Sequence, residues 1–300
     1  MITASVIVTY NPDLKALNDL VSSIYHSVKE VVIVDNGSGN VSDIGQLTAH
    51  FANVEILLLN ENKGIGYAQN RGIEKVFSDS EVEAVVLFDH DSHPSNDMIE
   101  KLVSNYQQLV AQNIPVGAVG SIFIDPRTGN KYPIAVYDGF RLKKILPAKD
   151  DMNPVFTSFL IASGCFIPRK TIEFVGMMNE SFFIDYIDIE WSFRVYSKGL
   201  QLYVCPEATM FHQVGDERLE VLGREISIHS PLRRYYLARN SVLMTKIGYI
   251  SWKYKVREMV YTFSRVIIYL FLVKNRLTYL RYIVRGWRDG ILGRKGAYIR

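Results

Sequence analysis

The first hundred residues alternate between short apolar runs and segments with helical spacing. Apolar and mostly β-branched runs predict strands at 4–9, 31–34, 54–59 and 84–88. Apolar side chains recur at helical spacing over 14–28, 64–77 and 98–110. Because the predicted strands are apolar throughout, we expect a mostly parallel sheet with helices on both faces. The predicted fold class is α/β, with ligands bound beyond the carboxyl ends of the strands.

Composition narrows the class of protein further. The chain has 300 residues, of which 48% are hydrophobic and 22% are charged, and this excludes a disordered chain. Cys165 and Cys205 are too few for a disulfide framework, so a reducing compartment is expected. The sequence begins without the basic and then apolar segments of a secretory signal, and we therefore expect a cytoplasmic protein.

Charge divides the chain into two parts. Residues 246–300 contain 13 Lys and Arg against two acids, a net charge of about +11, whereas residues 1–245 carry about −8. The apolar stretch 259–273 contains Arg265 and is shorter than the ~20 residues that span a bilayer. Basic residues among Trp and Tyr instead favour a helical region on an anionic membrane surface, at the inner face of the cell membrane. An ordinary packing helix, or a contact in a homodimer, is the alternative. No nucleic-acid motif is present.

Two acids directly follow the apolar strand predicted at 84–88. Asp89 and Asp91 are two residues apart, so both carboxylates can converge on one hard divalent cation such as Mg²⁺ or Mn²⁺. A cation there stabilises a departing diphosphate. A solvated turn is the alternative interpretation, and position at the carboxyl edge of a sheet favours the metal.

Polar residues also follow the other predicted strands. Asp35 ends a strand and could accept a hydrogen bond from a nucleotide base or ribose, or could simply cap its own turn. Residues 62–72 form a Gly-rich loop that opens a helix, which favours anions. The loop lacks both the dinucleotide fingerprint and the Gly-Lys-Ser/Thr of a phosphate-binding loop.

A second acidic cluster lies among aromatic residues. Asp185, Asp188 and Glu190 fall within six residues, and carboxylates in apolar surroundings can act as general bases. Glu190 could instead pair with Arg194, four residues later on a helix. His212 follows a short predicted strand, where a single histidine is more often structural.

Several short motifs occur in one order, at 8–12, 34–38, 62–64, 89–92, 163–164 and 182–194. This ordered set resembles the inverting family-2 nucleotide-sugar glycosyltransferases of GT-A fold. Within that family it is most similar to bacterial rhamnosyltransferases, which use dTDP-L-rhamnose to build O-antigen and related surface polysaccharides. The resemblance covers about residues 1–245. It implies a catalytic domain over 1–245, with a nucleotide-binding half (1–115) and an acceptor half (116–245), followed by the basic region 246–300.

The resemblance also implies roles for individual residues. It assigns Asp188 as the catalytic base, with Asp185 as the alternative, and Glu190 belongs to the same catalytic set. Its nucleotide-binding residues are Thr9, Tyr10, Asn11, Asp35, Asn36, Gly64, Asn70, Arg71 and Asp89. Its metal ligands for Mg²⁺ or Mn²⁺ are Asp89, Asp91 and His212. Its acceptor residues are Trp191, Arg194 and Gly164.

The implied partners are a nucleotide-sugar donor, a saccharide acceptor that is lipid-linked, and the membrane surface. UDP-galactofuranose or UDP-glucose is the alternative donor. The alternatives of another class are a sugar nucleotidyltransferase and a non-catalytic scaffold. The first normally has a Gly-rich basic loop after its first strand, where this chain has Thr9-Tyr10-Asn11-Pro12-Asp13.

Overall fold

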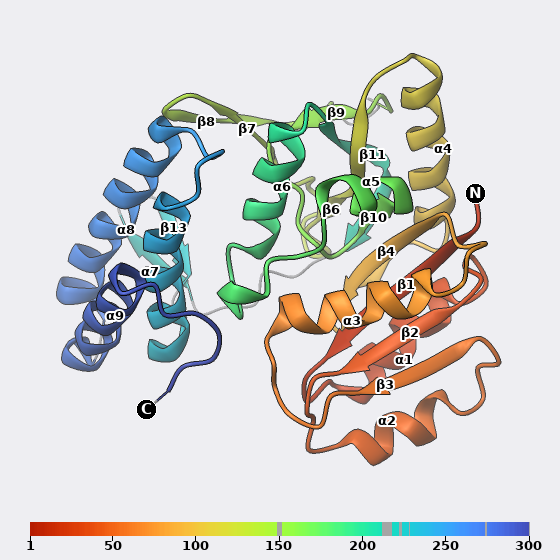
Figure 1. Cartoon of the computed structure of the whole chain (residues 1–300), viewed down its shortest axis with the longest axis horizontal. Helices are drawn as coiled ribbons and strands as arrows, with labels where there is room; N and C mark the ends of the chain where they lie inside the picture. The colour runs from red at the N-terminus through yellow and green to blue at the C-terminus, as the bar shows by residue number, and fades with distance from the viewer. Residues whose placement is uncertain (149–151, 212–217, 222–223, 228, 274, 300) are drawn as a thin grey trace.

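The computed structural model describes residues 1–148, 152–211, 218–221, 224–227, 229–273 and 275–299 (Figure 1). Within these residues nine strands form one central sheet, in the order β3-β2-β1-β4-β10-β6-β11-β5, with β9 paired to β11. Strands β3, β2, β1, β4, β6 and β11 run parallel, whereas β10, β5 and β9 run antiparallel to their neighbours. The predicted α/β class is confirmed.

The strands of the central sheet are β1 (Thr3–Thr9), β2 (Val31–Asp35), β3 (Val54–Leu58), β4 (Ala84–Asp89), β5 (His93–Pro94), β6 (Val116–Ile124), β9 (Val155–Thr157), β10 (Cys165–Pro168) and β11 (Gln201–Phe211). Two hairpins lie outside it, β7 (Ile134–Asp138) with β8 (Arg141–Ile145), and β12 (Arg218–Val221) with β13 (Arg224–Ser227). Every residue of β1 and β2 is buried, as the unbroken apolar runs predict.

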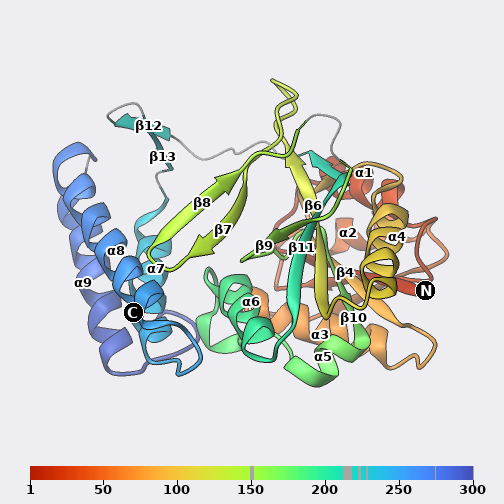
Figure 2. The same cartoon turned by 90° about the horizontal axis from the view of Figure 1, so that it is seen from above.

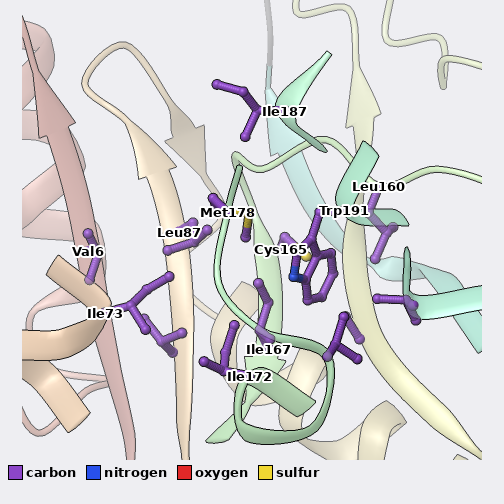
Figure 3. Close-up of a cluster of buried hydrophobic side chains, with 14 of the residues drawn as sticks. Val6, Ile73, Leu87, Leu160, Cys165, Ile167, Ile172, Met178, Ile187 and Trp191 are labelled. Carbon is purple, nitrogen blue, oxygen red and sulfur yellow. The ribbon is translucent and has the colours of Figure 1, made fainter. Parts of the chain in front are cut away.

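Helices cover both faces of the sheet, and each face has its own apolar core. One face packs against α1 (Leu14–Ile24), α2 (Val41–Thr48) and α4 (Met98–Ala111). The other packs against α3 (Ile65–Phe77), α5 (Arg169–Val175) and α6 (Ile187–Ser197), which follows the short 3₁₀ helix η1 (Glu180–Phe182). Figure 3 shows part of this second core, where Val6, Ile73, Leu87, Ile167 and Trp191 gather.

The C-terminal region is helical. Its helices are α7 (Pro231–Thr245), α8 (Trp252–Leu272) and α9 (Arg276–Ile291). Ser230 caps α7 with its side chain, and Pro231 occupies the first turn, where no N–H is needed. Figures 1 and 2 both show the three helices together at one side of the molecule, beyond α6. Because α7 packs closely on α9, the predicted boundary at residue 245 falls inside this bundle.

Strand prediction fails after residue 124, where the hairpin β7–β8 was not expected, and again near the end of the sheet. The apolar runs 200–204 and 208–212 predict two strands, but Gln201–Phe211 is a single strand with a register shift against β6 between Cys205 and Thr209. Pro206, which lacks an N–H for the ladder, lies inside the shift. Both cysteines are buried and free.

Candidate active site

The loops after β1 and β2 are tied together by one buried carboxylate. Asp35 accepts hydrogen bonds from Thr9 Oγ1 (3.0 Å) and from the backbone N–H groups of Gly37 and Ser38 (3.1 and 2.9 Å). Its exposed fraction is 2%. Asp35 therefore caps its own turn, which is the alternative interpretation given above. Its buried carboxylate leaves little surface for contact with a nucleotide base.

Two asparagines extend this network of loops. Asn11, with φ of +49°, receives the N–H of Gly39 on its side-chain oxygen (2.8 Å), and its own N–H donates to Ser38. Asn36 Oδ1 accepts the N–H of Lys63 (2.9 Å), which joins the loop after β3. Tyr10, 48% exposed, lies between Thr9 and Asn11. The carboxyl ends of β1, β2 and β3 thus form one hydrogen-bonded polar surface with an aromatic ring on it.

Asn70 and Arg71, predicted to line a nucleotide pocket, have other partners. Asn70 is buried, exchanges two hydrogen bonds with the backbone of Met178 (2.9 and 3.0 Å) and donates to Glu180 (2.7 Å). Arg71 pairs with Glu74 (2.7 Å). That prediction is corrected for Asn70, because its amide is used up in joining α3 to the segment before η1.

Gly64 brings the loop after β3 against the segment that precedes Asp185. Its φ is +92°, and a Cβ atom there would lie 2.6 Å from the carbonyl oxygen of Phe183. The next N–H, of Ile65, donates to that same oxygen (2.8 Å). Only glycine allows this close approach.

The two acidic clusters come together in the folded chain. Asp89 is the last residue of β4 and Asp188 lies in the first turn of α6. Burial raises the pKa of Asp89 to about 7, and the negative charges of Asp91 and Asp188 contribute to the rise. A negative charge raises the pKa of a carboxylate only when it lies nearby, so Asp188 lies close to Asp89 in the folded chain. Residues almost a hundred positions apart therefore share one electrostatic environment.

The pKa of Asp188 is shifted toward neutrality. Burial raises the pKa of Asp188 to about 6, hydrogen bonds from the backbone N–H groups of Ile189 and Ala162 oppose the rise, and the charge of Asp185 adds to it. A carboxylate with a pKa near neutrality can accept a proton from a hydroxyl group and release it again.

A turn before β10 holds the two acidic clusters against each other. Ser163 Oγ lies 2.5 Å from Ser92 Oγ, beside the Asp89 turn. Ser192 Oγ accepts the N–H of Leu160 and donates to the carbonyl of Asp188 (2.7 Å). Gly164, predicted to contact the acceptor, has φ of +75° and donates to the carbonyl of Leu87 in β4 (2.8 Å). Its backbone thus belongs to this turn.

Arg233 is a site residue that sequence reasoning missed. It lies in the first turn of α7, and its guanidinium makes a bidentate pair with Asp185, with N–O distances of 3.0–3.3 Å. Its positive charge also acts on Asp89, where it lowers the pKa. The pair of arginines at 233–234 is visible in the sequence, but nothing local indicates a partner 48 residues away.

Glu190 forms an ion pair with Arg194, which is the alternative to a catalytic role that the sequence analysis predicts. Its carboxylate makes two hydrogen bonds with Arg194 (both 3.0 Å) and accepts a further one from Tyr249, with 1% of Glu190 exposed. Arg194 is thereby directed into the protein, with a further hydrogen bond to the carbonyl of Val175.

Trp191 does not face an acceptor, and the prediction is wrong for this residue. Its side chain is 2% exposed and packs beside Leu160 and Cys165 in the core (Figure 3). Its indole N–H donates to the carbonyl of Gly176 (3.0 Å). The reason is helical periodicity, because Ile187, Trp191 and Val195 form the buried stripe of α6.

The predicted metal ligands are described only in part. Asp89 and Asp91 lie at the end of β4, while His212 is outside the described residues. Phe211, at the end of β11, pairs with His93, two residues after Asp91. Within the described residues no three His, Cys, Asp or Glu side chains are placed to hold a metal ion together. The two carboxylates fit Mg²⁺ or Mn²⁺, since these ions take oxygen ligands from one or two carboxylates and complete their shell with water and phosphate.

Comparisons with known proteins identify the family and agree with the fold. The model of glycosyl transferase family 2 matches residues 5–173. The dTDP-rhamnosyl transferase RfbF of Shigella flexneri is 33% identical over 292 residues, which cover 97% of this chain and 96% of RfbF. Solved structures show the same fold. S. aureus TarS 1-349 in complex with UDP-GlcNAc has a TM-score of 0.58 at 14% identity, covering 97% of this chain and 81% of that chain. The mannosyltransferase PcManGT of Pyrobaculum calidifontis, in complex with GDP-Man and Mn²⁺, has a TM-score of 0.56 at 14% identity, with coverage of 98% and 88%.

Proposed function

Because this chain belongs to glycosyl transferase family 2, we propose that it transfers L-rhamnose from dTDP-L-rhamnose to a saccharide acceptor in surface polysaccharide synthesis. That it is a glycosyltransferase follows from the family and from its likeness to RfbF over nearly the whole chain. The rhamnosyl donor is inferred from the same likeness. The observation that carries the mechanism is that the hydrogen-bonded turn before β10 joins the Asp89 turn to the start of α6, where Asp188 lies.

The donor side of the proposed site is the surface at the ends of β1, β2 and β4. Thr9, Asn11, Asp35 and Asn36 hold the loops that receive the nucleoside, and Tyr10 offers an exposed ring for stacking on the base. Asp89 and Asp91, with His212, would hold Mg²⁺ or Mn²⁺. Once bound, this cation supplies positive charge that stabilises the diphosphate leaving group.

Asp188 is the proposed base. It removes the proton from the acceptor hydroxyl, whose oxygen attacks the anomeric carbon. The bond from that carbon to the diphosphate oxygen breaks, and its electron pair leaves with dTDP. Attack from the face opposite the leaving group inverts the configuration. Asp188 is favoured over Asp185 because Asp185 is held in a bidentate pair by Arg233, and over Glu190 because Glu190 is buried against Arg194.

The C-terminal bundle supports a lipid-linked acceptor. The outer side of α8 carries exposed apolar residues at helical spacing, and these are Trp252, Val256, Val260, Phe263, Ile267 and Phe271. Both acids of the region, Glu258 and Asp289, are buried and bonded to Tyr186 and Tyr235. Exposed charge on α8 and α9 is therefore basic, which suits an anionic bilayer and opposes contact with a second copy.

None of the helices in the described residues has the length and hydrophobicity needed to span a bilayer. The proposed association is therefore peripheral, at the cytoplasmic face of the membrane. In the proposed division of labour, residues 1–245 carry the chemistry and residues 246–300 dock the enzyme where a lipid-linked acceptor lies.

A panel of nucleotide sugars tests the proposal. The purified chain is incubated with dTDP-L-rhamnose, UDP-galactofuranose or UDP-glucose, with Mg²⁺, Mn²⁺ or EDTA, and the released nucleotide is measured. We expect dTDP release from dTDP-L-rhamnose with either metal and none with EDTA. Release of pyrophosphate would indicate a nucleotidyltransferase, and turnover of a UDP-sugar alone would replace the donor. Asp188→Asn should retain dTDP binding and lower turnover by ~10²–10⁴-fold; unchanged turnover would favour a scaffold.

A further inference from the structure

The segment between η1 and α6 has an unusual backbone. Phe183, Asp185 and Tyr186 all have positive φ, at +65°, +63° and +66°, although none is glycine. Positive φ is unfavourable for residues with a side chain, because Cβ approaches the neighbouring carbonyl oxygen. The surrounding protein must therefore hold this segment, which we call the acidic loop (residues 182–186). It carries Asp185 and leads directly into the helix turn with Asp188.

One buried amide meets most of the acidic loop's carbonyl groups. Asn240, on α7, has no exposed surface. Its Nδ2 donates to the carbonyl oxygens of Phe182 (3.0 Å), Ile184 (2.8 Å) and Asp185 (3.2 Å). Three carbonyls turned toward one donor group require the backbone to curl around it, and the positive φ angles of Phe183, Asp185 and Tyr186 produce this curl.

Arg239 orients that amide. Its Nε donates to Oδ1 of Asn240 (3.0 Å), so the NH₂ group of Asn240 must face the loop. A second guanidinium nitrogen of Arg239 donates to the carbonyl of Phe182 (2.8 Å) and a third to that of Gly296 (2.5 Å). The N–H of Gly296 returns a hydrogen bond to the carbonyl of Ser181 (2.9 Å). The C-terminal segment thus closes the same network.

We propose that Arg239 and Asn240 are positioning residues that hold the acidic loop, so that Asp185 meets Arg233 and Asp188 keeps its place in the first turn of α6. Neither residue reaches the reacting atoms. They act through the loop backbone, by placing hydrogen-bond donors where its carbonyls point. The inference deepens the proposed function and rests on it for the role of Asp188.

Asn240→Asp is the sharpest test, because it keeps the size of the side chain and replaces the donor by an acceptor. The matched control is Ser241→Ala. Ser241 is the next residue, is equally buried, and donates within its own helix to Ala238. Two quantities are measured for both variants. One is the hydrogen exchange of the peptide that covers residues 182–188, and the other is the kinetics of dTDP-L-rhamnose hydrolysis. Hydrolysis uses water as the acceptor, so no saccharide is needed.

We expect Asn240→Asp to exchange about tenfold faster over 182–188 and at the wild-type rate over 35–38. Its kcat should fall by about 100-fold while KM for dTDP-L-rhamnose stays within about threefold, and Ser241→Ala should match the wild type. If Asn240→Asp does not fold, Asn240→Ala removes the donors without adding charge and is held to the same criteria.

Unchanged exchange over 182–188 overturns the proposal, whatever happens to turnover. So does faster exchange with unchanged kcat, or an equal loss of kcat and dTDP binding. Failure of the proposed function looks different: wild-type protein then neither hydrolyses dTDP-L-rhamnose nor binds dTDP, while the exchange experiment still reports on the loop.

Discussion

At the scale of single residues, the acids at the centre of the site weaken the fold that carries them. The pKa of Asp89 is raised to about 7 and that of Asp188 to about 6, so both bind protons more tightly in the folded chain than in the unfolded one. Their stabilising contribution is therefore largest below about pH 4 and is lost as pH rises to 7. The proposed function requires this loss of stability, because a catalytic base must be able to take up a proton near neutral pH.

The first prediction concerns this pH dependence. At pH 8 and in the presence of EDTA, the free energy of unfolding of Asp188→Asn should be about 1–2 kcal/mol higher than that of the wild type. The reason is that the variant has no buried negative charge at this position. The difference should shrink toward pH 4, where Asp188 is protonated in the folded state and the unfolded state begins to take up the same proton. Urea unfolding at both pH values measures it. A difference that does not change with pH would contradict the assignment of a raised pKa.

Glu190 gives the opposite prediction. Glu190→Ala leaves the buried side of Arg194 without its carboxylate partner and should cost about 3 kcal/mol of stability. Turnover per folded molecule should change little. Urea unfolding and dTDP-L-rhamnose hydrolysis measure the two effects, with Asp188→Asn as the comparison. Loss of turnover at unchanged stability would return Glu190 to the catalytic set.

At the scale of elements, the turn before β10 decides how β4 and α6 meet. A Cβ atom on Gly164 would lie 2.3 Å from Ser121 Oγ, and the φ of Gly164 is +75°. Gly164→Ala should therefore destabilise the protein by about 2–3 kcal/mol and lower hydrolysis, because the turn orients both acidic clusters.

Gly199→Ala is the matched control for that variant. Gly199 has a similar φ of +79°, but a Cβ atom there meets nothing within 4 Å. It should show the cost of backbone strain alone, about 1 kcal/mol, with normal turnover. Thermal unfolding separates the two. Equal effects on stability and turnover would mean that packing at the turn is unimportant.

At the scale of the whole molecule, the apolar stripe of α8 and the basic charge around it should bind anionic vesicles. We expect binding to vesicles with about 30% anionic lipid at 0.1 M salt and release at 0.5 M, because salt screens the attraction. Phe263→Glu should reduce the partition coefficient at least tenfold. Sedimentation with vesicles measures both.

Phe174→Glu is the control for the vesicle experiment. Phe174 is 56% exposed, similar to Phe263 at 60%, but it lies on α5, away from the bundle. This variant should bind as the wild type does. Vesicle binding lost equally in both variants, or a dimer of the wild type that Phe263→Glu dissociates, would indicate that the stripe serves another purpose.

Local patterns determined much of this protein. The four strands and the helices α1, α3 and α4 of the first hundred residues, the burial of β1 and β2, and the placement of Asp89 at a strand end follow from periodicity and turn chemistry, which a few neighbouring residues decide. The short helix α2 was not predicted. The pairing of Glu190 with Arg194 was also readable, because both lie on one helix, four residues apart.

Only the tertiary structure decided which side chains meet across the chain. Asn70 turned away from the donor site because Met178 and Glu180 pack on α3, and Trp191 entered the core because α6 lies against the sheet. Arg233 reached Asp185, and Asn240 reached the acidic loop, from a helix roughly fifty residues later. Such contacts leave no local pattern, since hydrogen bonds and ion pairs depend on distance in space and not on distance along the sequence.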